Sequence, residues 1–276
     1  MKIFRFKPFW LMFFPSFLYA QVSWVPIGAD CWALGGQSLT QSSVFGVQNN
    51  PAAITKIEKL NIGLYQELRF RQTALMLSAI SLVQPIKWIH IGLGIVQQGN
   101  SGFNQQKINL SLAKKLGPQL ALGINLTYVA THIAETDSKS NYLAEIGLLY
   151  VPNSKTDIGF FVFNPTQVNY QFAISEPFAS FIRMGVSYKL STQLKVLGEF
   201  EHRIIYGNSL KLGFEYSPVP KFFLAAGWSQ NPQYITFGSG FQTKKYKINL
   251  AFSKHAVLGF TPHVSLVLNQ FNSGKK

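Results

Sequence analysis

The chain has 276 residues, of which 47% are hydrophobic, 14% aromatic and only 13% charged. Because disordered chains are rich in charge and poor in aromatic residues, this composition excludes a disordered protein. The formal net charge is +14. However, the lysines stand singly or in pairs, mostly in expected turns, so the charge favours anionic lipid head groups over nucleic acid as a partner.

Residues 1–20 have the features of a secretory signal peptide. Three basic residues precede or border the apolar run 8–19, and cleavage is expected near Ala20. An uncleaved membrane anchor is the alternative, which Pro15 and the short apolar run disfavour. The single cysteine, Cys31, excludes an internal disulfide in this exported chain.

The segment that follows, residues 21–59, has no clear helical or strand periodicity. The stretches "GADCWALGG" at 28–36 and "NNPAAI" at 49–54 offer small residues, amides and almost no charge. Glycine permits tight turns and close backbone approach, and amide side chains can satisfy backbone groups. The composition indicates a compact, polar segment that precedes the main fold.

From residue 60 onward, apolar side chains alternate with polar or small ones. In the run 210–216, for example, four apolar residues alternate with Lys211, Gly213 and Glu215. A period of two is typical of strands with one apolar face. About fourteen such strands are predicted, near 60–68, 71–83, 88–98, 104–115, 119–132, 141–151, 156–164, 178–190, 192–204, 208–217, 221–230, 234–243, 246–254 and 262–271.

The connections between these strands are expected to alternate between short and long. Short ones are expected at 84–87, 116–118, 152–155, 189–192, 218–221 and 243–245, and longer ones at 133–140, 164–177 and 254–261. A soluble β-sandwich is the alternative, but its two ends need not differ, whereas outer-membrane barrels have short turns at one end and longer loops at the other. We therefore predict an all-β protein, a transmembrane antiparallel up-and-down β-barrel of about 14 strands in the outer membrane of a Gram-negative cell. The barrel would cover residues 60–271, followed by a tail at 272–276.

A short motif, Gly-x-x-Tyr, recurs before three of the short turns. Its tyrosines are Tyr150, Tyr188 and Tyr216, each on the apolar face of its strand. Tyrosine suits the head-group layer, because its ring is apolar and its hydroxyl is hydrated. The motif predicts an aromatic girdle at the short-turn end.

Several charged residues fall on the opposite, inward face of the predicted strands. They are Glu145, Arg183, Lys195, Glu199, Glu201, Lys211 and Glu215. Charges of this kind are tolerated in a barrel lumen but not against lipid. Two interpretations stay open: an ion-pair network that fixes strand register and fills the lumen, or a polar constriction that selects solutes.

The sequence contains no motif that indicates catalysis. The five histidines lie on separate strands and loops without metal-ligand spacing, and the glycine-rich stretches lack the Lys-Ser/Thr and helix of a phosphate loop. We predict that the protein is not an enzyme, with no catalytic residue, no metal site and no cofactor.

The N-terminal motif resembles that of the FadL-like outer-membrane proteins, a superfamily that includes the PorV and PorQ proteins linked to type IX secretion. The matching residues are Gly28, Ala29, Gly35, Gly36, Asn50, Pro51 and Ala52, followed by the strand "LNIGLYQEL". Asp30 and Gln37 depart from the family pattern, which has Arg and Ala there. The resemblance implies a fourteen-stranded barrel whose N-terminal segment, residues 21–59, folds into the lumen as a plug. A disordered periplasmic tail is the alternative.

Two functions follow from this resemblance. One is a passive conduit for hydrophobic small molecules, as in FadL; the other is a non-catalytic partner subunit of a secretion or envelope-assembly complex, as in PorV and PorQ. Because the largest outer connection, 164–177, is short, we expect no large capture groove and favour the partner subunit. The expected partners are outer-membrane lipid and lipopolysaccharide, a protein of a larger complex, and a hydrophobic ligand or detergent in the lumen.

Overall fold

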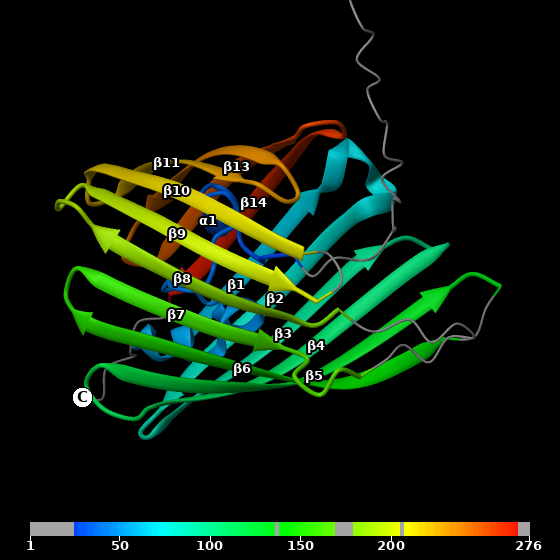
Figure 1. The fold of residues 1–276 in the computed structure, drawn as a ribbon, viewed down its shortest axis with the longest axis horizontal. Helices are drawn as coiled ribbons and strands as arrows, with labels where there is room; N and C mark the ends of the chain where they lie inside the picture. The colour runs from blue at the N-terminus through cyan, green and yellow to red at the C-terminus, as the bar shows by residue number, and fades with distance from the viewer. Residues whose placement is uncertain (1–24, 136–137, 169–178, 205–206, 270–276) are drawn as a thin grey trace, which may run out of the picture.

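The computed structural model describes residues 25–135, 138–168, 179–204 and 207–269. Fourteen antiparallel strands form one closed barrel in which each strand pairs with its neighbours in the sequence and β14 pairs with β1 (Figure 1). The predicted fold class is therefore confirmed, and a β-sandwich is excluded. The signal peptide, the cleavage position near Ala20 and the tail lie outside the described residues, so the predicted domain bounds stay predictions.

The strands follow the predicted runs closely. They are β1 (Asn61–Leu68), β2 (Met76–Ile86), β3 (Ile89–Gly99), β4 (Phe103–Lys115), β5 (Leu120–Ile133), β6 (Lys139–Asn153), β7 (Thr156–Phe163), β8 (Phe181–Lys189), β9 (Leu194–Arg203), β10 (Gly207–Val219), β11 (Phe222–Ser229), β12 (Tyr234–Gln242), β13 (Tyr246–His255) and β14 (Gly259–Asn269). Among the described residues, no helix has the length and apolar character to cross a membrane.

The two faces of each strand differ as the alternation predicts. On β10, Leu210, Leu212 and Phe214 point outward and are 40%, 41% and 54% exposed, whereas Ser209 and Lys211 point inward and are buried. Each outward side chain would meet lipid, where apolar groups are favoured and charges are costly. Closure of the sheet gives hydrogen-bond partners to the backbone N–H and C=O groups at the strand edges, which lipid could not supply.

Two connections differ from the prediction. Strand β2 begins at Met76 instead of residue 71, because short 3-10 turns, η2 (Arg69–Arg71) and η3 (Thr73–Leu75), intervene. Phe70 and Arg71 have φ of 53° and 60°, which a strand cannot accommodate. The expected long loop at 254–261 is only a tight turn, in which the backbone nitrogens of residues 257 and 258 donate to His255 Nδ1.

The N-terminal segment 25–57 lies inside the barrel as a plug. It contains α1 (Ala29–Trp32), α2 (Gly46–Asn49) and η1 (Pro51–Lys56), drawn in blue within the ring of strands (Figure 1). α1 contacts β12 to β14, α2 contacts β2 to β4, and η1 contacts β3 to β6. Between residues 25 and 57 only Ser42 is exposed, so this part of the segment is no disordered tail.

Candidate functional site

Inward-facing glycines let the plug approach the barrel wall. A Cβ built on Gly123 of β5 would lie 2.4 Å from the backbone nitrogen of Ala52, and one on Gly227 of β11 would lie 2.1 Å from that of Gly35. No side chain fits at these positions unless the plug moves. The wall glycines whose added Cβ would lie 2.8 Å or less from a plug atom are Gly63, Gly92, Gly94, Gly123, Gly147, Gly159, Gly213, Gly227 and Gly238. Two of them, Gly147 and Gly213, belong to the Gly-x-x-Tyr motif.

The first half of the predicted plug motif forms the turns around α1. Gly28 precedes α1 with φ of 114°, and Gly35 and Gly36 follow it with φ of 76° and 79°. These left-handed conformations are strained for residues with a Cβ, which explains the glycines. Ala29 lies fully buried within α1.

The second half of the motif caps η1. The Asn50 side chain accepts from the Ala52 nitrogen at 3.1 Å and donates to the carbonyls of Leu39 at 2.8 Å and Leu148 at 3.2 Å. Pro51 occupies the first position of η1, where its missing N–H costs nothing. Asn50 thus joins two parts of the plug to strand β6 of the barrel.

Asp30, which departs from the family pattern, faces a cation of the wall. Its Oδ2 lies 3.4 Å from Lys247 Nζ on β13. A second ion pair, Lys56 Nζ to Asp157 Oδ1 at 2.7 Å, ties η1 to β7. The plug is therefore held by polar contacts at both of its ends.

The structure places the predicted inward charges in three separate groups. Four of them, Arg183, Glu199, Glu201 and Lys211, lie together: Arg183 Nε is 2.6 Å from Glu201 Oε2, and Lys211 Nζ lies 2.9 Å from Glu199 and 3.0 Å from Glu201. Arg203, which shares the inward parity of β9 with Glu199 and Glu201, also pairs with Glu201. Because every member is deeply buried or paired, the group satisfies its own charges.

The remaining predicted charges lie elsewhere. Glu145 pairs with Lys107 on β4 at 2.7 Å and accepts from Asn125 at 2.6 Å. Lys195 and Glu215 form a more accessible pair at 3.0 Å, toward the short-turn end. Lys107 was missed, although it shares the inward parity of its strand with the buried Asn109 and Ser111.

A further polar group at the β1–β14 seam was also missed. The Tyr65 hydroxyl donates to Glu67 Oε2 at 2.7 Å and lies 2.8 Å from His263 Nδ1, while Ser253 Oγ lies 2.9 Å from His263 Nε2. The His263 ring stacks on Trp32 of the plug with 4.6 Å between centroids. This group therefore couples α1 to the seam at which the barrel closes.

Above the plug, at the long-loop end, the barrel contains a cavity of about 770 Å³. Part of its wall is apolar, with Trp32 of the plug and Phe70, Leu75, Phe103 and Leu258 of the barrel. The other part is polar, with Glu67, Arg69, Arg203, Lys211, Ser253 and His263. The cavity has the size and mixed lining of a small-molecule site.

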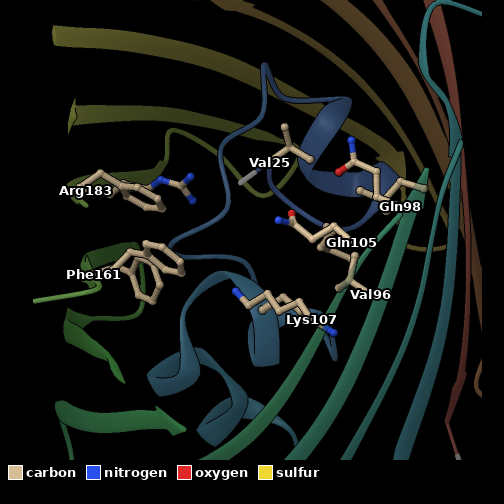
Figure 2. A pocket seen from close by; sticks show the side chains of 12 residues that line it. Val25, Val96, Gln98, Gln105, Lys107, Phe161 and Arg183 are labelled. Carbon is tan, nitrogen blue, oxygen red and sulfur yellow. The ribbon is translucent and has the colours of Figure 1, made fainter. Parts of the chain in front are cut away.

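A much smaller cavity, of about 30 Å³, adjoins this one. Val25 and Gln98 line both. Phe161 and Arg183 face Val96 and Gln105 across it, with Val25 of the plug between them (Figure 2). Its volume suits only one or two water molecules, so it extends the larger cavity without holding a ligand of its own.

A third cavity, of about 390 Å³, lies below the plug at the short-turn end. It is lined by plug residues such as Ser42, Lys56 and Ile57 and by Gln242 and Asn269 of the strand ends. It shares no lining residue with the upper cavity. The plug therefore separates two cavities at opposite ends of the lumen.

The three girdle tyrosines lie at the short-turn ends of β6, β8 and β10 and point outward. Tyr150 and Tyr188 are each 42% exposed and Tyr216 is 46% exposed. Trp88 and Tyr246 have exposed side chains at the same end of the barrel. Their role at a membrane interface stays a prediction. Within the described ranges, no three His, Cys, Asp or Glu residues are grouped so that they could hold a metal ion.

Neither a protein-family model nor a curated protein sequence matches the chain. Solved structures do match its fold. The CymD monoaromatic hydrocarbon channel is 14% identical with a TM-score of 0.69, and the match covers 90% of this chain and 98% of that one. The toluene transporter TbuX of Ralstonia pickettii is 13% identical, with a TM-score of 0.63 and 90% and 98% covered.

A FadL homologue of Pseudomonas aeruginosa also matches, with 13% identity, a TM-score of 0.62, and 88% of this chain and 98% of that chain covered. The chain therefore has the FadL-like outer-membrane barrel fold that its N-terminal motif predicts. The particular resemblance to PorV and PorQ stays a prediction.

The preference for a non-catalytic secretion or envelope-assembly subunit is wrong. The solved barrels that share this fold are described as hydrocarbon channels and transporters, not as subunits of such complexes. The preference depends on the short outer loops, which predict no large capture groove. The structure shows instead that the room lies within the barrel mouth, above the plug.

Proposed function

We propose that this protein is an outer-membrane conduit for hydrophobic small molecules, exported by a signal peptide that is cleaved near Ala20. The observation that carries the proposal is the cavity of about 770 Å³ at the long-loop end, with an aromatic and aliphatic wall. Burial of apolar surface drives a hydrophobic molecule into such a site. The hydrocarbon-channel description of the structural neighbours supports it.

Passage through the barrel requires the plug to shift, because the plug separates the upper cavity from the lower one. The contacts that hold it include hydrogen bonds, ion pairs and close glycine contacts, and plug residues such as Phe45 and Val47 share a buried apolar cluster with wall residues such as Leu77. Water that enters the lumen can replace polar contacts at modest net cost. Plug rearrangement is therefore the gating step in this proposal.

We infer that the protein transports without catalysis. The Ser253–His263 pair has the order of a nucleophile and its base, but Tyr65 takes the Nδ1 hydrogen bond and the Glu67 carboxylate lies 3.5 Å from that nitrogen. Ser253 is also almost completely buried. The group is a structural support for the seam and for Trp32.

The test is uptake of a labelled monoaromatic hydrocarbon, toluene, by Gram-negative cells that express the full chain. A tryptophan that fills the upper cavity, Ala74→Trp, should reduce the uptake several-fold. Ala226→Trp, on the lipid side of β11, is the matched control and should not. Uptake equal to that of cells without the protein, for toluene and for a long-chain fatty acid alike, would overturn the proposal.

A further inference from the structure

Every short turn of the barrel has at least one lysine within it or at the end of the strand that leads into it. The turns join β2 to β3, β4 to β5, β6 to β7, β8 to β9, β10 to β11 and β12 to β13. Their lysines are Lys87, Lys114, Lys115, Lys155, Lys189, Lys221, Lys244 and Lys245, which we call the lysine ring. All eight are exposed, and Lys244 also lines the cavity at the short-turn end. None of them forms an ion pair with an acidic residue in the described part of the chain.

The long-loop end has no such ring. Its described connecting residues, at 69–75, 100–102, 134–135, 138, 164–168, 179–180, 204, 230–233 and 256–258, include only three charged side chains: Arg69, Arg71 and Glu135. Arg69 is already paired with Glu67. The strand ends there add Lys139 and Lys254, so the long-loop end has fewer exposed cations than the short-turn end.

The lysine ring borders the outward-facing aromatic residues. Trp88, which is 73% exposed, follows Lys87 in the chain, and the Lys87 ammonium lies 5.3 Å from the centre of its ring. Tyr188 precedes Lys189, and Tyr246 follows Lys245. Because aromatic side chains of this kind occupy the membrane–water interface, the neighbouring ammonium groups reach the level of the lipid phosphates.

The distribution of the ring decides between a lipid and a protein as its occupant. Six turns spread the charge around the rim from β2 to β13, whereas a protein partner would contact one sector. Annular lipids surround a barrel on every side, and unpaired lysines attract anionic head groups from the adjoining leaflet. Short turns of outer-membrane barrels face the periplasm, so that leaflet is the periplasmic one.

We propose that the lysine ring binds the phosphate groups of anionic phospholipids in the periplasmic leaflet. This binding anchors the short-turn end at a fixed depth. It is independent of whether the lumen transports a ligand.

The test uses purified full-length protein in detergent with an equimolar mixture of phosphatidylglycerol and phosphatidylcholine, and native mass spectrometry counts each bound lipid. Wild-type protein should retain about fivefold more phosphatidylglycerol than phosphatidylcholine. The triple variant Lys87→Gln/Lys155→Gln/Lys221→Gln removes three of the eight lysines and should lower this preference clearly. The matched control, Arg71→Gln/Lys139→Gln/Lys254→Gln, removes the same charge from the long-loop end and should keep it.

Two further measurements distinguish loss of lipid binding from loss of folding, and lipid binding from binding of free phosphate. Heat-modifiable migration on gels shows that each variant is folded before its lipids are counted. Inorganic phosphate at millimolar concentration should not displace the lipid, because the acyl chains hold the head group beside the ring. Equal retention of the two lipids by wild type, equal losses in both triple variants, or displacement by free phosphate would each overturn the proposal.

Discussion

The Glu199 carboxylate of β9 accepts a 2.8 Å hydrogen bond from the backbone nitrogen of Ser38 in the plug. The same carboxylate lies 2.9 Å from Lys211 Nζ on β10 and accepts a longer bond from the Leu39 nitrogen. One buried side chain thus connects the ion-pair group around Glu201 with the backbone of the plug. A substitution in that group should therefore weaken the contacts that hold the plug.

Glu199→Gln should loosen the plug without unfolding the barrel. The variant removes one of two carboxylates that compensate Arg183 and Lys211, and loss of a partner from a buried ion pair costs about 3–5 kcal/mol when nothing replaces it. Glu201 stays in place, so the cost should lie below that range. Hydrogen exchange of residues 35–45 should accelerate, and bilayer conductance should rise.

Glu215→Gln is the control for this experiment. Within the described residues, Glu215 forms an ion pair with Lys195 alone, and this pair is more accessible to solvent. Its loss should change neither plug exchange nor conductance. Equal effects of the two variants would show that Glu199 has no special connection to the plug.

Gly123→Ala should displace η1 from the wall. The added methyl would lie 2.4 Å from backbone atoms of residues 51 and 52, which cannot rotate away. Overpacking of this kind costs roughly 1–3 kcal/mol, and hydrogen exchange across 50–56 should report it. Gly198→Ala on the lipid face is the control, since its nearest atom would be Leu212 Cδ2 at 4.0 Å. If Gly123→Ala changed neither the stability nor the hydrogen exchange, the plug would tolerate the methyl by moving freely.

The strands could be predicted because a period of two survives in sequence wherever one face meets lipid. The start of β2 could not, because the left-handed conformations of Phe70 and Arg71 depend on contacts such as the Phe70 nitrogen to Thr261 Oγ, 191 residues away. The prediction of a long loop at 254–261 was wrong for a related reason. Two backbone bonds to His255 let β13 and β14 continue almost to the turn.

The alternation along a strand shows that a charged side chain points into the lumen, but it does not show which charged side chains form ion pairs. Arg183 and Glu201 are direct cross-strand partners in the register of β8 and β9, whereas Glu145 lies two or more strands from them and needs Lys107. The group around His263 joins β1, β13 and β14, the two ends of the chain. Only closure of the barrel brings those residues together, so a reading along the chain could not find them.

Leu93→Lys should impair insertion, because it places a charge on the lipid face near the middle of β3. Leu93 is 49% exposed on the outside of the barrel. A lysine at the bilayer centre of a barrel costs roughly 2–4 kcal/mol, to be measured by urea titration of folding into vesicles. Gln98→Lys, on the inward face of the same strand and lining the upper cavity, should cost far less. Equal losses would refute the assignment of the two faces.

Cys31 offers a direct probe of plug packing. The thiol is fully buried within α1, and burial raises the pKa of the Cys31 thiol well above its ordinary value. Since the thiolate is the reactive form, a maleimide should label folded protein very slowly, and raising the buffer from pH 7 to pH 9 should restore little reactivity. Labelling should become rapid once the protein is denatured.

The matched control for this probe is Ser42→Cys in a Cys31→Ser background. Ser42 is the exposed position of the plug and lines the cavity at the short-turn end, so its replacement should react readily in folded protein. Comparable rates at the two positions would mean that α1 leaves the barrel wall often enough to expose its thiol. If the plug is anchored through Glu199, the Glu199→Gln variant should raise the Cys31 rate toward that of the control, while Glu215→Gln should leave it slow.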